Sequence, residues 1–131
     1  MERSVRTSFR STRWEETELV AGEPRLTRAS CDQTYTGDLT GSSTLEYLMA
    51  YRAGGAATFV GMERIDAIVA GRRGTFALRH VGTFEDGVAR MALEIVEGSG
   101  TGELVGLSGG GEFESPHAES YEVTLGCVFR E

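Results

Sequence analysis

The stretch that decides the fold is "ATFVGMERIDAIVAGRRGTFALRHVGTFEDG", residues 57–87, in which apolar and polar side chains alternate with a period of two. Such alternation is typical of β-strands, whose successive side chains point to opposite faces. The turn sequence "AGRRG" separates the runs 57–69 and 75–84, and "EDG" follows the second run. The stretch therefore predicts two antiparallel strands joined by a short turn.

The same pattern extends over the rest of the chain. We predict six further strands, at residues 5–15, 26–36, 43–52, 88–96, 110–114 and 120–129, with turn residues such as "TGDLTG" and "RAGGA" between them. Eight sequential strands would leave exposed edges unless the sheet closes on itself. We therefore predict an all-β fold, a closed antiparallel up-and-down barrel forming a single domain over residues 1–131, with at most one helical turn near 101–107.

A glycine-rich segment, "VEGSGTGELVGLSGGG" at residues 96–111, raises the question of a phosphate-binding loop. Its glycines do not match the spacing of the dinucleotide fingerprint. A P-loop needs a lysine, and every cationic side chain among the 13 in this chain is an arginine. We expect a structural role, because Gly98, Gly100, Gly102, Gly106 and Gly109 would permit a tight turn in which a Cβ would clash.

Composition narrows the functional classes. The net charge of −7 opposes sequence-independent binding to nucleic acid. No secretory signal and no run of 18 apolar residues is present, so we expect a cytoplasmic protein without a membrane partner. The two cysteines, Cys31 and Cys127, are far apart and form no metal or redox motif, so we expect reduced thiols, no metal and no cofactor.

Five segments resemble a known family. They are "LTRASCDQTYTGDLTG", "LEYLMAYR", "FVGMERI", "GRRGTFALRHVGTFEDGVAR" and "GSGTGELVGLSG". Together they resemble the bacterial domain-of-unknown-function family 3224, and the resemblance implies an allene oxide cyclase-like barrel. The glycine-rich segment is also similar to that of allene oxide cyclases and dirigent proteins. Such barrels share an axial cavity that holds a flexible, largely apolar molecule, and the resemblance implies no particular catalytic residue.

Two side chains are candidates for acid–base chemistry. Glu63 is the only charged residue on its face of strand 57–69, and His80 lies on the predicted inner face of strand 75–84 among aromatic residues. A buried carboxylate needs a partner, and an imidazole titrates near neutrality. Each could be catalytic, or each could be a structural group satisfied by a buried partner. A metal site would require both side chains to meet Glu46.

Further residues are candidates for ligand binding. Pattern alone does not decide whether strand 43–52 turns Glu46 or the tyrosines Tyr47 and Tyr51 inward. The other candidates are aromatic, and each could equally be packed in the core: Trp14, placed where strand 5–15 gives way to a loop, and Phe59, Phe76 and Phe84.

Three functions remain open on this basis. The first is binding of a small, largely apolar molecule in an axial cavity, with cofactor-free isomerisation or cyclisation as its catalytic form. The second is a non-catalytic carrier, and the third is a structural module with a solid core. Because strands 43–52 and 57–69 carry apolar residues on both faces, we also expect a homo-oligomer.

Overall fold

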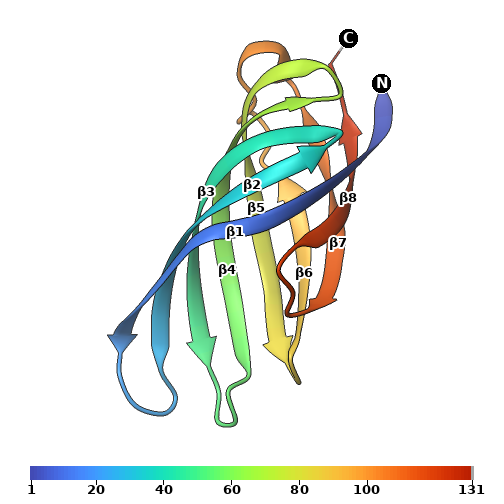
Figure 1. Ribbon diagram of the computed structural model, residues 1–131. Helices are drawn as coiled ribbons and strands as arrows, with labels where there is room; N and C mark the ends of the chain where they lie inside the picture. The colour runs from blue at the N-terminus through green and yellow to red at the C-terminus, as the bar shows by residue number, and fades with distance from the viewer. Residues whose placement is uncertain (131) are drawn as a thin grey trace.

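A computed structural model describes residues 1–130, and within them eight antiparallel strands form a closed barrel (Figure 1). Each strand pairs with its sequence neighbours, and β1 also pairs with β8, which closes the barrel. One 3-10 helix, η1 (Gly102–Leu104), interrupts the connection from β6 to β7. The predicted fold class and the predicted helical turn are confirmed. The strands are β1 (Glu2–Val20), β2 (Leu26–Gly37), β3 (Leu39–Tyr51), β4 (Ala57–Val69), β5 (Arg72–Glu85), β6 (Val88–Ile95), β7 (Ser108–Pro116) and β8 (Tyr121–Val128).

The strand bounds differ from the prediction most in β1 and β3. β4 has the predicted bounds, but β1 continues to Val20, so Trp14 lies inside this strand and not at its end. β3 begins at Leu39, so only Asp38 remains between β2 and β3 where the sequence predicted a longer turn. The run of charged residues after Trp14 is typical of a loop, although its backbone pairs with β2 as far as Val20.

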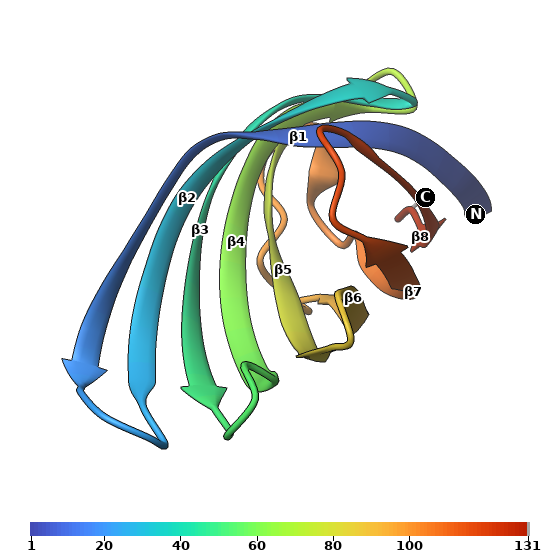
Figure 2. The same ribbon diagram turned by 60° about the horizontal axis from the view of Figure 1, so that its bottom comes forward.

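β1 has different partners along its length. Its residues 2–9 pair with β8 on one edge, whereas its residues 10–20 pair with β2 alone. Within residues 1–130, the second half of β1 therefore has no partner strand on one edge, and both views show it standing away from β6 to β8 (Figures 1 and 2). β7 and β8 share only three residue pairs, at 108–110 of β7.

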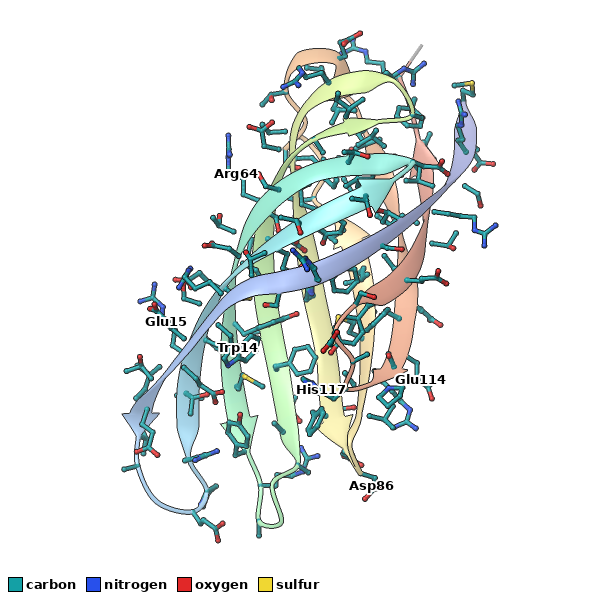
Figure 3. The ribbon with its side chains drawn as sticks, viewed as in Figure 1. Trp14, Glu15, Arg64, Asp86, Glu114 and His117 are labelled. Carbon is teal, nitrogen blue, oxygen red and sulfur yellow. The ribbon has the colours of Figure 1, made fainter. Side chains whose placement is uncertain are left out.

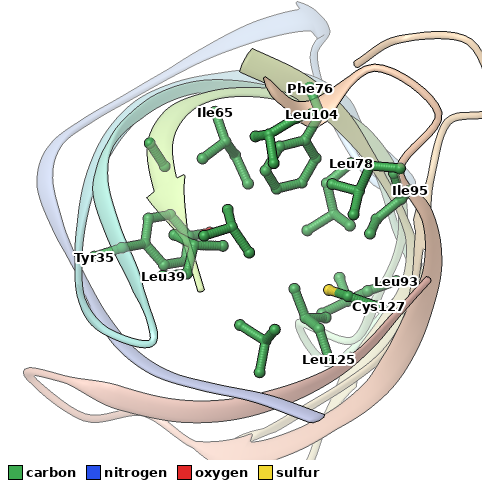
Figure 4. Packing of buried hydrophobic residues seen from close by; sticks show 14 of the residues in the cluster. Tyr35, Leu39, Ile65, Phe76, Leu78, Leu93, Ile95, Leu104, Leu125 and Cys127 are labelled. Carbon is green, nitrogen blue, oxygen red and sulfur yellow. The ribbon is translucent and has the colours of Figure 1, made fainter. Parts of the chain in front are cut away.

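This pairing gives the barrel two unlike ends, which we call the closed end and the flared end. The closed end is defined by Val5, Val69, Phe76, Leu104 and Leu125, which belong to the larger of the two buried apolar clusters. Figure 4 shows side chains of this cluster pointing into the barrel. The flared end is defined by Trp14, Met49, Tyr51, Phe59 and Phe84, and its apolar cluster is smaller.

The glycine-rich segment covers the closed end. Leu104 and Leu107 enter the core with about 1% of their surface exposed, and the amide of Thr101 donates to the carbonyl of Thr75 at 2.8 Å. A Cβ at Gly100 would stand 1.9 Å from the carbonyl oxygen of Leu104, and one at Gly109 would stand 1.9 Å from that of Gly126. The segment thus has the structural role predicted for it, since only glycine permits these approaches.

Candidate functional site

A buried polar network lies between the two apolar clusters, with Glu63 of β4 at its centre. Its side chain has no exposed surface, because β4 turns it into the barrel below the closed-end core. Its Oε2 accepts hydrogen bonds from the hydroxyl of Tyr35 at 2.6 Å and from that of Ser43 at 2.5 Å. These donors come from β2 and β3 and supply the partners that a buried carboxylate requires.

His80 of β5 extends the network toward the flared end. Its Nε2 lies 2.8 Å from Oε1 of Glu63, and its Nδ1 lies 2.9 Å from the hydroxyl of Tyr47. An ionised Glu63 only accepts, so Nε2 carries the proton that is donated to it. In a neutral imidazole Nδ1 then accepts from Tyr47, and the three side chains form a continuous chain of hydrogen bonds.

The two tyrosines of the network keep their protons at high pH. Burial, followed by the charge of Glu63, holds the pKa of Tyr35 well above its usual value. The pKa of Tyr47 is raised for the same two reasons, in the same order. Both phenols therefore remain protonated hydrogen-bond donors at neutral pH.

The flared end presents aromatic side chains to the interior. Trp14 is opposite the buried Cys31 in the β1–β2 ladder, and its ring centroid lies 6.1 Å from that of Tyr47. Phe59 packs edge-on against Tyr47 at 5.0 Å. Although Trp14 faces inward, 48% of its surface is exposed, because no strand covers this half of β1 (Figure 3).

A second carboxylate, Glu16, organises the rim of the flared end. Its Oε2 accepts from the hydroxyls of Tyr51 at 2.6 Å and Thr27 at 2.7 Å, and its Oε1 accepts from the indole of Trp14 at 3.4 Å. Burial alone would raise the pKa of Glu16, but these hydrogen bonds and nearby Arg25 outweigh burial and lower it. The guanidinium of Arg25 stacks over the Tyr51 ring at 4.2 Å.

The structure brings some of the predicted site residues together and separates others. Glu63, His80 and Tyr47 are in direct contact, and Tyr51 lies on the same inner face of β3 as Tyr47. Glu46 points outward and forms an ion pair with Arg28, so it does not line the interior.

The three phenylalanines also separate. Phe59 packs in the flared end, and Phe84 is partly buried against the same cluster. Phe76 is 1% exposed and belongs to the packed core of the closed end.

Several residues of these networks were missing from the sequence prediction, among them Tyr35, Ser43 and Glu16. The inner face of β2, which reads Ala29, Cys31, Gln33 and Tyr35, shows a period-two signal that could have identified Tyr35. Ser43 shares a face with Leu45 and Tyr47, so it could have been found once that face was known to point inward. Glu16 lay in a segment read as a loop.

Two hollows lie elsewhere. One, of about 770 Å³, lies between β1, β7, β8 and the end of β2, and another, of about 440 Å³, lies against β5 to β7. Neither is lined by Glu63 or His80, so neither is the predicted axial cavity.

Within the described residues, no three His, Cys, Asp or Glu side chains are placed to hold a metal ion, and no helix is long and apolar enough to span a bilayer.

Both cysteines are free and buried in the barrel wall. Burial, followed by the charge of Glu63, raises the pKa of the Cys31 thiol to about 12. Burial raises the pKa of Cys127 to about 11. Neither thiol forms a nucleophilic thiolate at neutral pH.

The fold and the site define a class of protein: a small closed β-barrel with a buried Tyr–His–Glu network beneath an open aromatic end. The profile of the family DUF3224, whose description is "Protein of unknown function", matches residues 5–126. The chain belongs to this family. The resemblance seen in the sequence is thereby confirmed for the family, whereas the likeness to allene oxide cyclases stays a prediction.

A solved structure agrees with this assignment. The crystal structure of a DUF3224 protein of unknown function from Shewanella oneidensis MR-1 is 31% identical to this chain, with a TM-score of 0.80. The match covers 100% of both chains. No curated protein matches the sequence.

Proposed function

We propose that the flared end binds a small, largely apolar molecule against Trp14, Tyr47 and Phe59. One observation carries the proposal: Trp14 faces the interior and yet keeps 48% of its surface exposed, whereas inward residues of the closed end are buried. An inward aromatic surface that the chain itself leaves uncovered favours an apolar ligand. Glu16 supports the same role by accepting hydrogen bonds from Trp14 and Tyr51, which orient both rings.

The catalytic form of this proposal is cofactor-free isomerisation or cyclisation. A bound molecule would meet the network at Tyr47, since Tyr47 packs beside Trp14 and Phe59 while Glu63 is fully enclosed. Tyr47 would accept a proton from the substrate at its hydroxyl oxygen while its own proton passes to Nδ1 of His80 and the Nε2 proton of His80 passes to Glu63. The reverse sequence would return a proton to the rearranged molecule. The flared end would hold the substrate in its reactive conformation.

A carrier without catalysis is the second candidate. It is favoured by the hydrogen bonds of Glu63, which accepts from Tyr35, Ser43 and His80 and so has its partners within the protein. In this case the network serves only to satisfy buried polar groups. The structural module is favoured by the packed closed end alone.

Native mass spectrometry of the chain purified from its own host tests binding, followed by denaturing extraction of any adduct. We expect a stoichiometric small molecule. Titration with the uncharged apolar dye Nile red, read by quenching of the single tryptophan, gives a second measurement. Absence of both an adduct and quenching contradicts the binding proposal.

Once the molecule is known, Glu63→Gln separates the two candidates. For an enzyme we expect Glu63→Gln to keep ligand affinity and to abolish turnover, because the proton relay loses its carboxylate. If no bound molecule is converted by the unmodified protein, the carrier is correct.

A further inference from the structure

The unpaired edge of β1 is the feature that carries a further inference. Phe9 is the last β1 residue paired with β8, where it meets Tyr121. From Arg10 to Val20 the strand pairs with β2 on one side and, within the described residues, with no strand on the other. Such an edge exposes backbone N–H and C=O groups that can pair with another strand.

We propose that two copies of this chain associate through these edges, with their β1 strands antiparallel and Trp14 at the two-fold axis. The inference goes beyond ligand binding and rests on the free backbone edge of β1, although both proposals involve Trp14. A bulge between Ser11 and Arg13 interrupts β1, so the register is set by the regular segment after the bulge, residues 13–18. In this segment Arg13 and Glu15 lie opposite Asp32 and Ser30 of β2, so both side chains share the outer face of the sheet.

The order of charges along β1 selects this register. A two-fold axis perpendicular to the sheet places each residue opposite its counterpart by reflection of the sequence about the axis. With the axis at Trp14, Arg13 is opposite Glu15 of the second copy, and this contact occurs twice. Opposite charges on directly facing residues stabilise a pair of strands.

Every other axis within residues 13–18 brings like charges opposite each other. An axis at Arg13 places two arginines opposite each other, and an axis at Glu15 or Glu16 places two glutamates opposite each other. An axis at Thr17 opposes Glu16 to Glu18. Charges on an edge normally prevent pairing because like charges meet, and within residues 13–18 only the axis at Trp14 avoids this.

The side chains required are available. The side chain of Glu15 has 72% of its surface exposed, and its Oε2 lies 3.4 Å from Nη1 of Arg13 in the same chain. Hydrogen bonds to Asp32, at 2.9 Å from Nε, hold Arg13 at the edge. Arg13 is thus fixed in place, while Glu15 is free to exchange its partner for the same arginine on the second copy.

Sedimentation velocity of the full chain over a range of concentrations tests the proposal. We expect a monomer–dimer equilibrium, and we expect Glu15→Arg to raise the dissociation constant by about tenfold or more, because it opposes two arginines at both symmetric contacts. The double variant Arg13→Glu and Glu15→Arg reverses both charges and should restore the dimer. Circular dichroism melting of each variant checks that it folds.

Val60→Glu is the matched control, because Val60 is exposed on the outer face of β4, away from the edge. It should leave the dimer unchanged. Hydrogen exchange provides a second readout, in which amides of residues 10–18 become protected as concentration rises. A chain that is monomeric throughout, a dimer insensitive to Glu15→Arg, or a dimer lost in Val60→Glu overturns the proposal.

Discussion

The closed end and the flared end are built from the same strands, yet they hold their inner faces in different ways. On β5, Phe76 and Phe84 share one face, but Phe76 is buried among side chains of several strands and under Leu104, whereas Phe84 is only partly buried. The difference follows from pairing, because β8 covers only the first half of β1. A single barrel thus combines a region that supplies stability with a region that leaves aromatic surface available.

Phe76→Ala should produce the largest effect on stability. The substitution leaves a cavity in the closed-end core, and we expect the free energy of unfolding to fall by about 3–5 kcal/mol. Chemical denaturation followed by circular dichroism measures the change.

Phe84→Ala is the control on the same strand and face. Since the ring is only partly buried, we expect a loss of about 1–1.5 kcal/mol. Equal losses at the two positions would remove the distinction between the two ends.

Glu63→Gln should have an intermediate effect, because Glu63 lies at the boundary between the ends. A glutamine keeps one oxygen to accept from Tyr35 and Ser43, but its amide nitrogen then faces His80, which must change tautomer to accept. We expect a loss of about 1–3 kcal/mol. Denaturation measures the loss, and a nitrogen NMR spectrum of His80 reports the tautomer. An unchanged tautomer with unchanged stability would show that the network is not as described.

Raising the pH should leave the stability of the fold unchanged near neutrality and should lower it strongly once the pH exceeds the ordinary tyrosine pKa. The pKa values of Tyr35 and Tyr47 are raised in the folded state, so the stabilisation is complete below the ordinary tyrosine pKa of about 10 and declines as pH rises above it. We expect the absorbance of tyrosinate from these two residues to appear only as the barrel unfolds.

Tyr51 provides the comparison within the flared end. Burial, followed by the hydrogen bond to Glu16, raises its pKa too, but the ring is far less buried and should ionise while the protein is still folded. Tyrosine-to-phenylalanine variants at positions 35, 47 and 51 assign each step. Ionisation of Tyr47 in the folded state would contradict its enclosure in the network.

The accuracy of the sequence prediction varied with the regularity of the alternation. β4 was predicted with its bounds because its alternation is unbroken and glycine turns flank it. β1 was predicted to end at Glu15 because its inner face continues as Glu16 and Glu18, in the flared end, where no apolar core imposes alternation. The part of β1 that extends beyond the core also lacks the alternation of apolar and polar residues.

The candidate site was predicted in part for a related reason. Period two shows that Glu63 and His80 face inward, but the height of each residue along the barrel depends on register between strands. Tyr35 meets Glu63 across 28 residues of sequence and Tyr47 meets His80 across 33, distances over which a one-chain pattern carries no information. The sequence therefore predicted Glu63 and His80, at the centre of the network, whereas Tyr35 and Tyr47 were identified as their hydrogen-bond partners only in the structure.

The closure of the barrel by β1 and β8 has a consequence for folding. The amide of Phe129 donates to the carbonyl of Met1 at 2.8 Å, and the reciprocal bond spans 128 residues of sequence. Hairpins such as β4–β5 can form locally, but the closing contacts become available only after the chain between them is in place. Folding of such non-local topologies falls in the range of about milliseconds to seconds. During synthesis, the first half of β1 therefore stays unpaired on one edge until β8 has left the ribosome.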